Sequence, residues 1–109
     1  MVTAELAAVL PAVVFVLAIA INAVAIGIDQ IRCVDAARMA ARSASRGDPP
    51  ARVSDIGQRA APGGAAVTVR SLGGDVEVIV SAAPPGPFGW LTGGHRLSAS
   101  VVAPVEATP

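Results

Sequence analysis

An uncharged apolar run near the start dominates the pattern of hydrophobic and polar positions along the chain. No residue from Leu6 to Ile28 is charged, and Glu5 and Asp29 flank the run. An α-helix rises about 1.5 Å per residue, so the run measures roughly 35 Å, enough to cross a hydrocarbon core of about 30 Å. The pattern therefore predicts a membrane-spanning helix over residues 6–28.

Two residues inside the run depart from the apolar pattern. Pro11 lies near the start of the helix, where a missing backbone hydrogen bond costs little, and it predicts a mild kink. Asn22 would be exposed to lipid unless it meets another helix, since amides in membranes hydrogen-bond across helix interfaces. Asn22 therefore predicts a packing partner for this segment.

Two other interpretations of the run remain open. The small residues at 23 and 25 fit a signal-peptidase site, and cleavage after Ala25 would release a small secreted domain. Against this, the run is longer than a usual signal segment and no basic stretch precedes it. A buried core helix is the other alternative, but the remaining chain is too small to cover so much apolar surface.

The helical pattern continues beyond the membrane as an amphipathic extension over residues 29–46. One face of the extension carries only small residues, namely Cys33, Ala37, Ala40, Ala41 and Ala44. The opposite face carries Asp35, Arg38, Arg42 and Arg46. Small side chains let helices approach closely, so this stripe is predicted to be a helix-packing face. One helix is expected from about Thr3 to Arg46, ended by Gly47.

A short second helix is predicted after this break. Asp48 is a favourable capping residue, and Pro49 suits a first helical turn. The apolar positions of the helix are Val53, Ile56 and Ala60. Residues 62–64, Pro-Gly-Gly, then interrupt the chain.

Two alternating runs joined by Gly73 and Gly74 predict a β-hairpin over about residues 65–82. With Leu72 opposite Asp75, the register places Val69 opposite Val78, Val67 opposite Val80, and Arg70 opposite Glu77. A third strand is expected at about residues 95–103, with Leu97, Ala99, Val101 and Ala103 on one face. The valine-lined face of the sheet should pack against the helices.

These elements define an α+β fold with two parts. Residues 1–46 form a long N-terminal helix, with its membrane span at 6–28 and its amphipathic extension at 29–46. Residues 47–109 form a small domain made of a short second helix followed by a three-stranded antiparallel β-sheet.

Composition and charge add mainly exclusions. The formal net charge is zero, so no basic surface points to nucleic acid. Cys33 is the only cysteine and His95 the only histidine, and one of each is too few for a zinc site. Cys33 is interpreted as a small buried hydrophobic residue. The carboxylates are scattered, with no pair placed for acid–base catalysis. We therefore expect no enzyme activity, no metal, no cofactor and no small-molecule substrate.

Glu5 is an unusual charge because it lies at the edge of the apolar run. One interpretation is that this carboxylate only marks where the span begins. The other is that it forms an ion pair with a cation at the edge of the lipid. The nearest candidate is the α-amino group of a neighbouring copy of the same helix, because a chain's own terminus points away along its axis. An ion pair at that depth is stronger than one in water.

Two blocks of the helix resemble a known family. The stretch VTAELAAVLP at the start and VDAARMAARSASRG at the end of the helix are similar to the TadE-like family of pilus-assembly proteins, in its actinobacterial form. The start of the motif is matched by Glu5, Leu6, Ala7, Leu10 and Pro11, and its end by Ala36, Ala37, Arg38, Ala40, Ala41 and Arg42. The distal stretch GWLTGGHRLSASVVA also resembles the family's C-terminal strand.

The resemblance implies a pilin-like fold and a role in a tight-adherence pilus. Proteins of this type resemble type IV pilins, in which a prepilin peptidase removes a leader and leaves a Glu at the fifth mature position. The implied residues of processing and assembly are Met1, Glu5 and Pro11, and the implied partners are membrane lipid, other pilin or assembly subunits, and a prepilin peptidase. The chain would be a minor pilin-like subunit or an assembly factor.

Orientation follows from the same comparison. The arginines after the span would by themselves place the C-terminal part in the cytoplasm. The family's basic leader, which the printed sequence does not include, would offset them and place the domain outside the membrane. The alternatives are a non-polymerising single-pass accessory protein of a secretion apparatus, or the small secreted domain released after Ala25.

Overall fold

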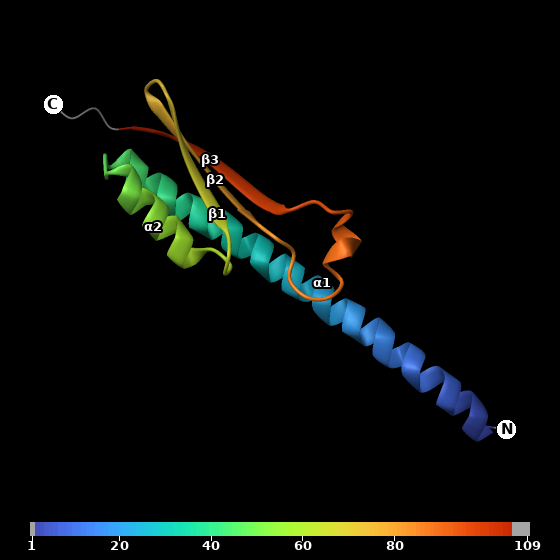
Figure 1. The fold of residues 1–109 in the computed structure, drawn as a ribbon. Helices are drawn as coiled ribbons and strands as arrows, with labels where there is room; N and C mark the ends of the chain where they lie inside the picture. Colours follow the sequence, from blue (N-terminus) through green and yellow to red (C-terminus); the bar gives the residue numbers. More distant parts are fainter. Residues whose placement is uncertain (1, 106–109) are drawn as a thin grey trace.

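The protein combines one long helix with a small sheet that lies along half of its length (Figure 1). The structure, a computed structural model, describes residues 2–105. Its elements are α1 (Val2–Ser45), α2 (Pro50–Ala60), β1 (Ala66–Leu72), β2 (Asp75–Ala82), the 3-10 helix η1 (Gly89–Thr92) and β3 (Leu97–Pro104). The molecule measures 81 × 21 × 17 Å, because the blue N-terminal half of α1 extends beyond everything else. The predicted α+β layout is confirmed.

Helix α1 is continuous across both predicted segments, the apolar run and the amphipathic extension. Its end is defined by Gly47, which has a positive φ of 85°. The N–H of Gly47 donates to the carbonyl oxygen of Ala44, and the N–H of Asp48 donates to that of Ser43. These two bonds form a Schellman motif, in which a left-handed residue satisfies the last carbonyls of a helix. The predicted stop at Gly47 is confirmed.

The strands form one antiparallel sheet in the order β1-β2-β3. The predicted hairpin register is confirmed, with Leu72 opposite Asp75 at the Gly73–Gly74 turn. On the outer face, the guanidinium Nη1 of Arg70 lies 3.4 Å from Oε1 of Glu77. The third strand pairs with β2, and its predicted apolar face turns inward.

The core lies between the inner face of the sheet and the C-terminal half of α1, with α2 packed beside it. Val78 and Val80 of the central strand are fully buried, as is Val53 of α2. Two polar contacts fix β3 along α1: Gln30 Nε2 donates to the Ser98 carbonyl at 2.9 Å, and Ser45 Oγ donates to that of Pro104 at 2.8 Å. The distal residues therefore share one core with residues 29–45 of α1.

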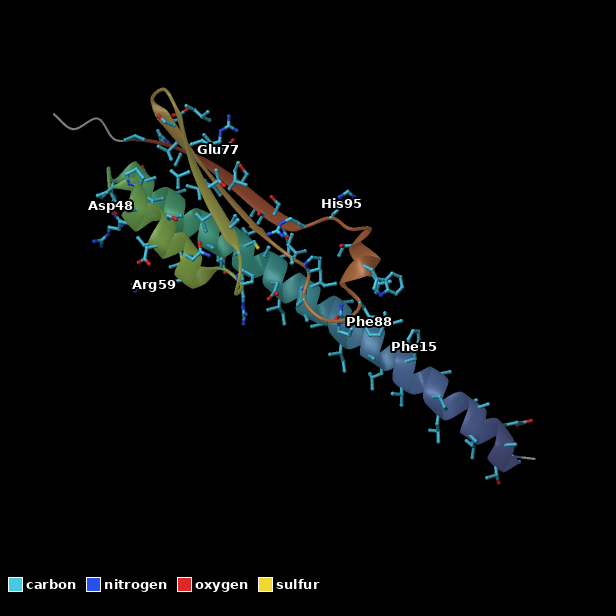
Figure 2. The ribbon with its side chains drawn as sticks, viewed as in Figure 1. Phe15, Asp48, Arg59, Glu77, Phe88 and His95 are labelled. Carbon is cyan, nitrogen blue, oxygen red and sulfur yellow. The ribbon has the colours of Figure 1, made fainter. Side chains whose placement is uncertain are left out.

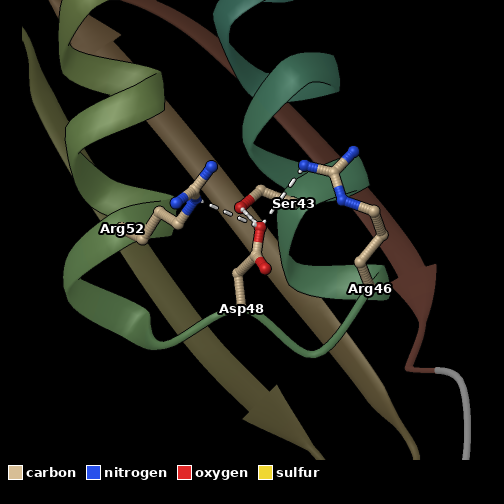
Figure 3. Close-up of polar contacts among 4 residues, drawn as sticks. All are labelled: Ser43, Arg46, Asp48 and Arg52. Carbon is tan, nitrogen blue, oxygen red and sulfur yellow. Dashed lines mark hydrogen bonds and ion pairs between the residues drawn. The ribbon is translucent and has the colours of Figure 1, made fainter.

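The predicted cap of α2 is wrong. The N-cap position is held by Pro49, with Pro50 in the first turn, and no side chain makes a capping hydrogen bond. The carboxylate of Asp48 turns back toward α1 instead, where Ser43 Oγ donates to its Oδ2 at 2.6 Å (Figure 3). Arg46 and Arg52 lie 3.3 and 3.6 Å from the same oxygen. Asp48 therefore links the two helices rather than starting the second one.

This cluster predicts a pH dependence of stability. The Ser43 hydroxyl, and then Arg46 and Arg52, lower the pKa of Asp48 below its ordinary value despite partial burial. A carboxyl group with a lowered folded-state pKa stabilises the fold above its unfolded pKa of about 3.9, and this contribution is lost as pH falls through the folded value. Asp48→Asn should therefore lower the denaturation midpoint at pH 6, and its difference from the native chain should shrink at pH 2–3.

The matched variant is Ser43→Ala, which removes the main donor to Asp48. This variant keeps the carboxylate of Asp48. Its denaturation midpoint should therefore change less between pH 6 and pH 2–3 than that of the native chain. A difference between Asp48→Asn and the native chain that stays constant from pH 6 to pH 2 would contradict the assignment.

Candidate functional site

The N-terminal half of α1 is a largely exposed apolar rod. Its large side chains are about half exposed or more, at Val2, Leu6, Val9, Leu10, Val13, Val14, Phe15, Val16, Leu17, Ile21 and Val24. Among the described residues, α1 is the one helix that is long enough and apolar enough to cross a membrane. Such a surface in water would be strongly unfavourable, because each exposed aliphatic side chain forgoes about 1.5–3 kcal/mol of burial. Such a surface suits an apolar environment, and the helix could cross a membrane.

The residues predicted for processing and assembly lie on this rod. Glu5 is exposed in the first turn of α1, where the helix dipole favours a carboxylate. Pro11 lies inside the helix, which continues unbroken past it. Met1 lies outside the described residues.

The small-residue stripe packs against the chain's own second helix and sheet. The side chains of Cys33, Ala37 and Ala40 are fully buried, and Ala41 and Ala44 are nearly so. All belong to the core formed with the chain's own sheet and α2. Helix α2 approaches the stripe closely, since a Cβ added at Gly57 would lie 3.4 Å from the Cβ of Ala40, and the same small side chains let the sheet approach α1.

A loop of the distal domain reaches onto the predicted membrane span. The segment between β2 and η1 folds back along α1, and the ring of Phe88 meets that of Phe15 edge-to-face, with centroids 5.7 Å apart (Figure 2). Pro87 and Phe88 form, with Ala18, Ile21, Asn22 and Ala25, an open groove of about 350 Å³. The sequence pattern did not indicate this contact, because the loop has no periodicity and lies far along the chain from Phe15.

Asn22 is the polar residue beneath this loop. It is only 6% exposed, and its Nδ2 group has no hydrogen-bond partner among the described residues. Its Oδ1 faces the backbone at Gly86, where φ is +78° and an added Cβ would overlap the amide oxygen. The partner predicted for Asn22 was a neighbouring helix, and the structure instead covers this residue with the chain's own loop.

The groups considered for chemistry lie apart. No cluster of three or more His, Cys, Asp or Glu side chains occurs within residues 2–105. Cys33 is buried, and desolvation, followed by the nearby charge of Asp29, raises the pKa of its thiol. A thiol held in its neutral form reacts slowly, which agrees with a packing role. His95 is exposed beside Arg96 before β3.

Comparisons of this chain with protein-family models, with curated proteins and with solved structures found no match. The geometry described above therefore carries the functional argument.

Proposed function

We propose that this protein is a pilin-like membrane subunit, acting in a tight-adherence pilus either as a minor subunit or as an assembly factor. Its N-terminal helix anchors it in the membrane as a single pass, and the domain carried on the second half of that helix lies outside the cytoplasm. The resemblance of the VTAELAAVLP block to TadE-like proteins supports the pilus assignment, and with it processing by a prepilin peptidase.

One observation carries the proposal. A single helix of 44 residues is apolar and largely exposed in its first half, apart from the face that the loop covers at Phe15 and Asn22, and forms the core of a folded domain in its second half. A rod of this kind can be transferred from lipid into a bundle of similar helices without unfolding the domain, because the two halves bury different surfaces. Assembly contacts thus belong to the bare half, not to the small-residue stripe.

Glu5 is the assembly residue of this proposal. Its carboxylate lies in the first turn, directly before the apolar run, where a neighbouring subunit's α-amino group would neutralise it in the bundle. Neither charge is well hydrated there, so their attraction is much stronger than in water. Loss of the carboxylate should weaken assembly while leaving the apolar anchor intact.

The test compares two carboxylate-to-amide substitutions in cells that make pili. Glu5→Gln should leave the protein in the membrane fraction and lower the yield of sheared pili about tenfold or more, which corresponds to about 1.4 kcal/mol of assembly free energy. The control is Asp75→Asn, at the exposed hairpin turn far from the rod, which should leave the yield unchanged. Normal piliation with Glu5→Gln would rule out the proposed role of Glu5.

A second candidate is a single-pass accessory protein of a secretion apparatus that never enters a filament. It is favoured by the burial of the small-residue stripe inside the chain itself, which removes one surface expected to contact other subunits. The two candidates differ in location: a subunit is recovered with purified sheared filaments, whereas an accessory protein stays in the membrane.

A further inference from the structure

The loop lies beside a part of α1 that would be inside a bilayer ending where the uncharged run ends. Phe15, which contacts Phe88, lies about 20 Å along the helix before Ile28, and Asn22 lies about 9 Å before it. If instead the bilayer ended at Asn22, the remaining uncharged run from Leu6 would measure only about 24 Å, less than a hydrocarbon core of about 30 Å. In either position the loop overlaps the outer part of the bilayer.

The chemistry of the loop suits that place. No residue from 78 to 94 is charged. Irregular backbone is costly in lipid because unpaired N–H groups lose their water, but the prolines at 84, 85 and 87 have no N–H to lose. Within η1 and after it, Leu91 N–H donates to the Phe88 carbonyl and Gly93 N–H to that of Trp90. Three residues of the loop thus have no backbone donor, and two further donors are paired within it.

The side chains of the loop add a membrane-interface pattern. Trp90 is 66% exposed and Leu91 45% exposed, and they follow shortly after Phe88, which contacts Phe15 of α1. Tryptophan is enriched at the boundary between headgroups and acyl chains, where its ring is in apolar surroundings and its N–H meets water. His95 and Arg96 follow at once and are exposed, at the end of the loop nearest β3. A cationic side chain there is placed to meet lipid phosphate.

We propose that the loop of residues 83–94 is a second membrane contact, inserted into the outer leaflet beside α1 with Trp90 at the headgroup boundary. The partner is a lipid surface, and the contact is continuous with the bare face of α1. The proposal rests on the membrane anchoring of α1 put forward above. The loop then sets the depth of the helix and shields Asn22 from the acyl chains.

Trp90 makes the proposal testable without labels. It is the only tryptophan, and the chain has no tyrosine. The full chain is reconstituted at low density in phosphatidylcholine–phosphatidylglycerol vesicles that contain lipids brominated either near the headgroup or deep in the acyl chain. Trp90 should be quenched more by the shallow bromines than by the deep ones, and about threefold less by acrylamide than a water-exposed tryptophan.

Two single-tryptophan variants complete the experiment, both carrying Trp90→Phe. Leu72→Trp, beside the hairpin turn and far from the loop, should be quenched by acrylamide and by neither brominated lipid. Val9→Trp, on the bare half of α1, should be quenched by the deep bromines. If Val9→Trp is quenched and Trp90 behaves like Leu72→Trp, the loop lies in water and the inference is overturned while the anchor stands. If Val9→Trp is also unquenched, α1 does not insert and the proposed function fails with it.

Discussion

Val80→Asn is expected to separate the sheet from α1. Val80 is fully buried on the central strand, opposite Val67 of β1 and Ala99 of β3. An unpaired amide there costs about 1–3 kcal/mol, and the lost burial of the valine adds about 1.5–3 kcal/mol. The core is built largely of alanines and valines, so it has little other apolar area to offset the loss.

Cys33 reports this opening directly. Its thiol is fully buried in the same core, so a water-soluble maleimide reacts only when the sheet leaves the helix. Val80→Asn should raise the labelling rate in mild detergent more than about a hundredfold, since each 1.4 kcal/mol is a factor of ten. Val102→Asn is the matched control, because Val102 faces outward on β3 and is 52% exposed. Equal labelling rates for the two variants would contradict the assigned core.

Ala40→Leu should displace α2 while leaving α1 intact. Ala40 is fully buried where α1, α2 and β1 meet. A Cβ added to Gly57 of α2 would lie 3.4 Å from the Cβ of Ala40 and 3.1 Å from Cγ1 of Val67, so the site has no room for a larger side chain. Overpacking of this kind costs about 1–3 kcal/mol.

The effect of Ala40→Leu is measured as a lower denaturation midpoint and about tenfold faster labelling of Cys33. The control is Ala51→Leu on the exposed side of α2, which should change stability by less than about 0.5 kcal/mol. If Ala40→Leu is as stable as Ala51→Leu, the three elements do not meet as closely as described.

Both predictions concern the core in which the small-residue stripe is buried. Alanines on a helix face allow a close approach by any partner, and sequence spacing does not say which partner arrives. In this chain the inner face of the sheet and Gly57 of α2 occupy the stripe. The apolar side chains that stay exposed lie mainly on the first half of α1 and in the loop around Trp90.

Local chemistry made several features predictable from the sequence. The hairpin register followed from Gly73–Gly74 and the alternation of valines, since side chains on a strand repeat every second residue. The end of α1 followed from Gly47, because glycine readily adopts the left-handed conformation that closes a helix. The prediction that Asp48 caps α2 was wrong because capping propensity is only a local preference. A hydroxyl on α1 and two arginines compete for that carboxylate in the folded chain.

The sequence by itself determined the apolar run, the elements and the α+β layout, because these depend on periodicity and on residues near one another in the chain. Only the tertiary structure decided what covers each face. It placed the sheet on the small-residue stripe and Asp48 between the two helices. It also placed the loop of residues 83–94 over Phe15 and Asn22. Such contacts join residues far apart in sequence, and they are selected by the shape and polarity of the whole molecule, which no local pattern encodes.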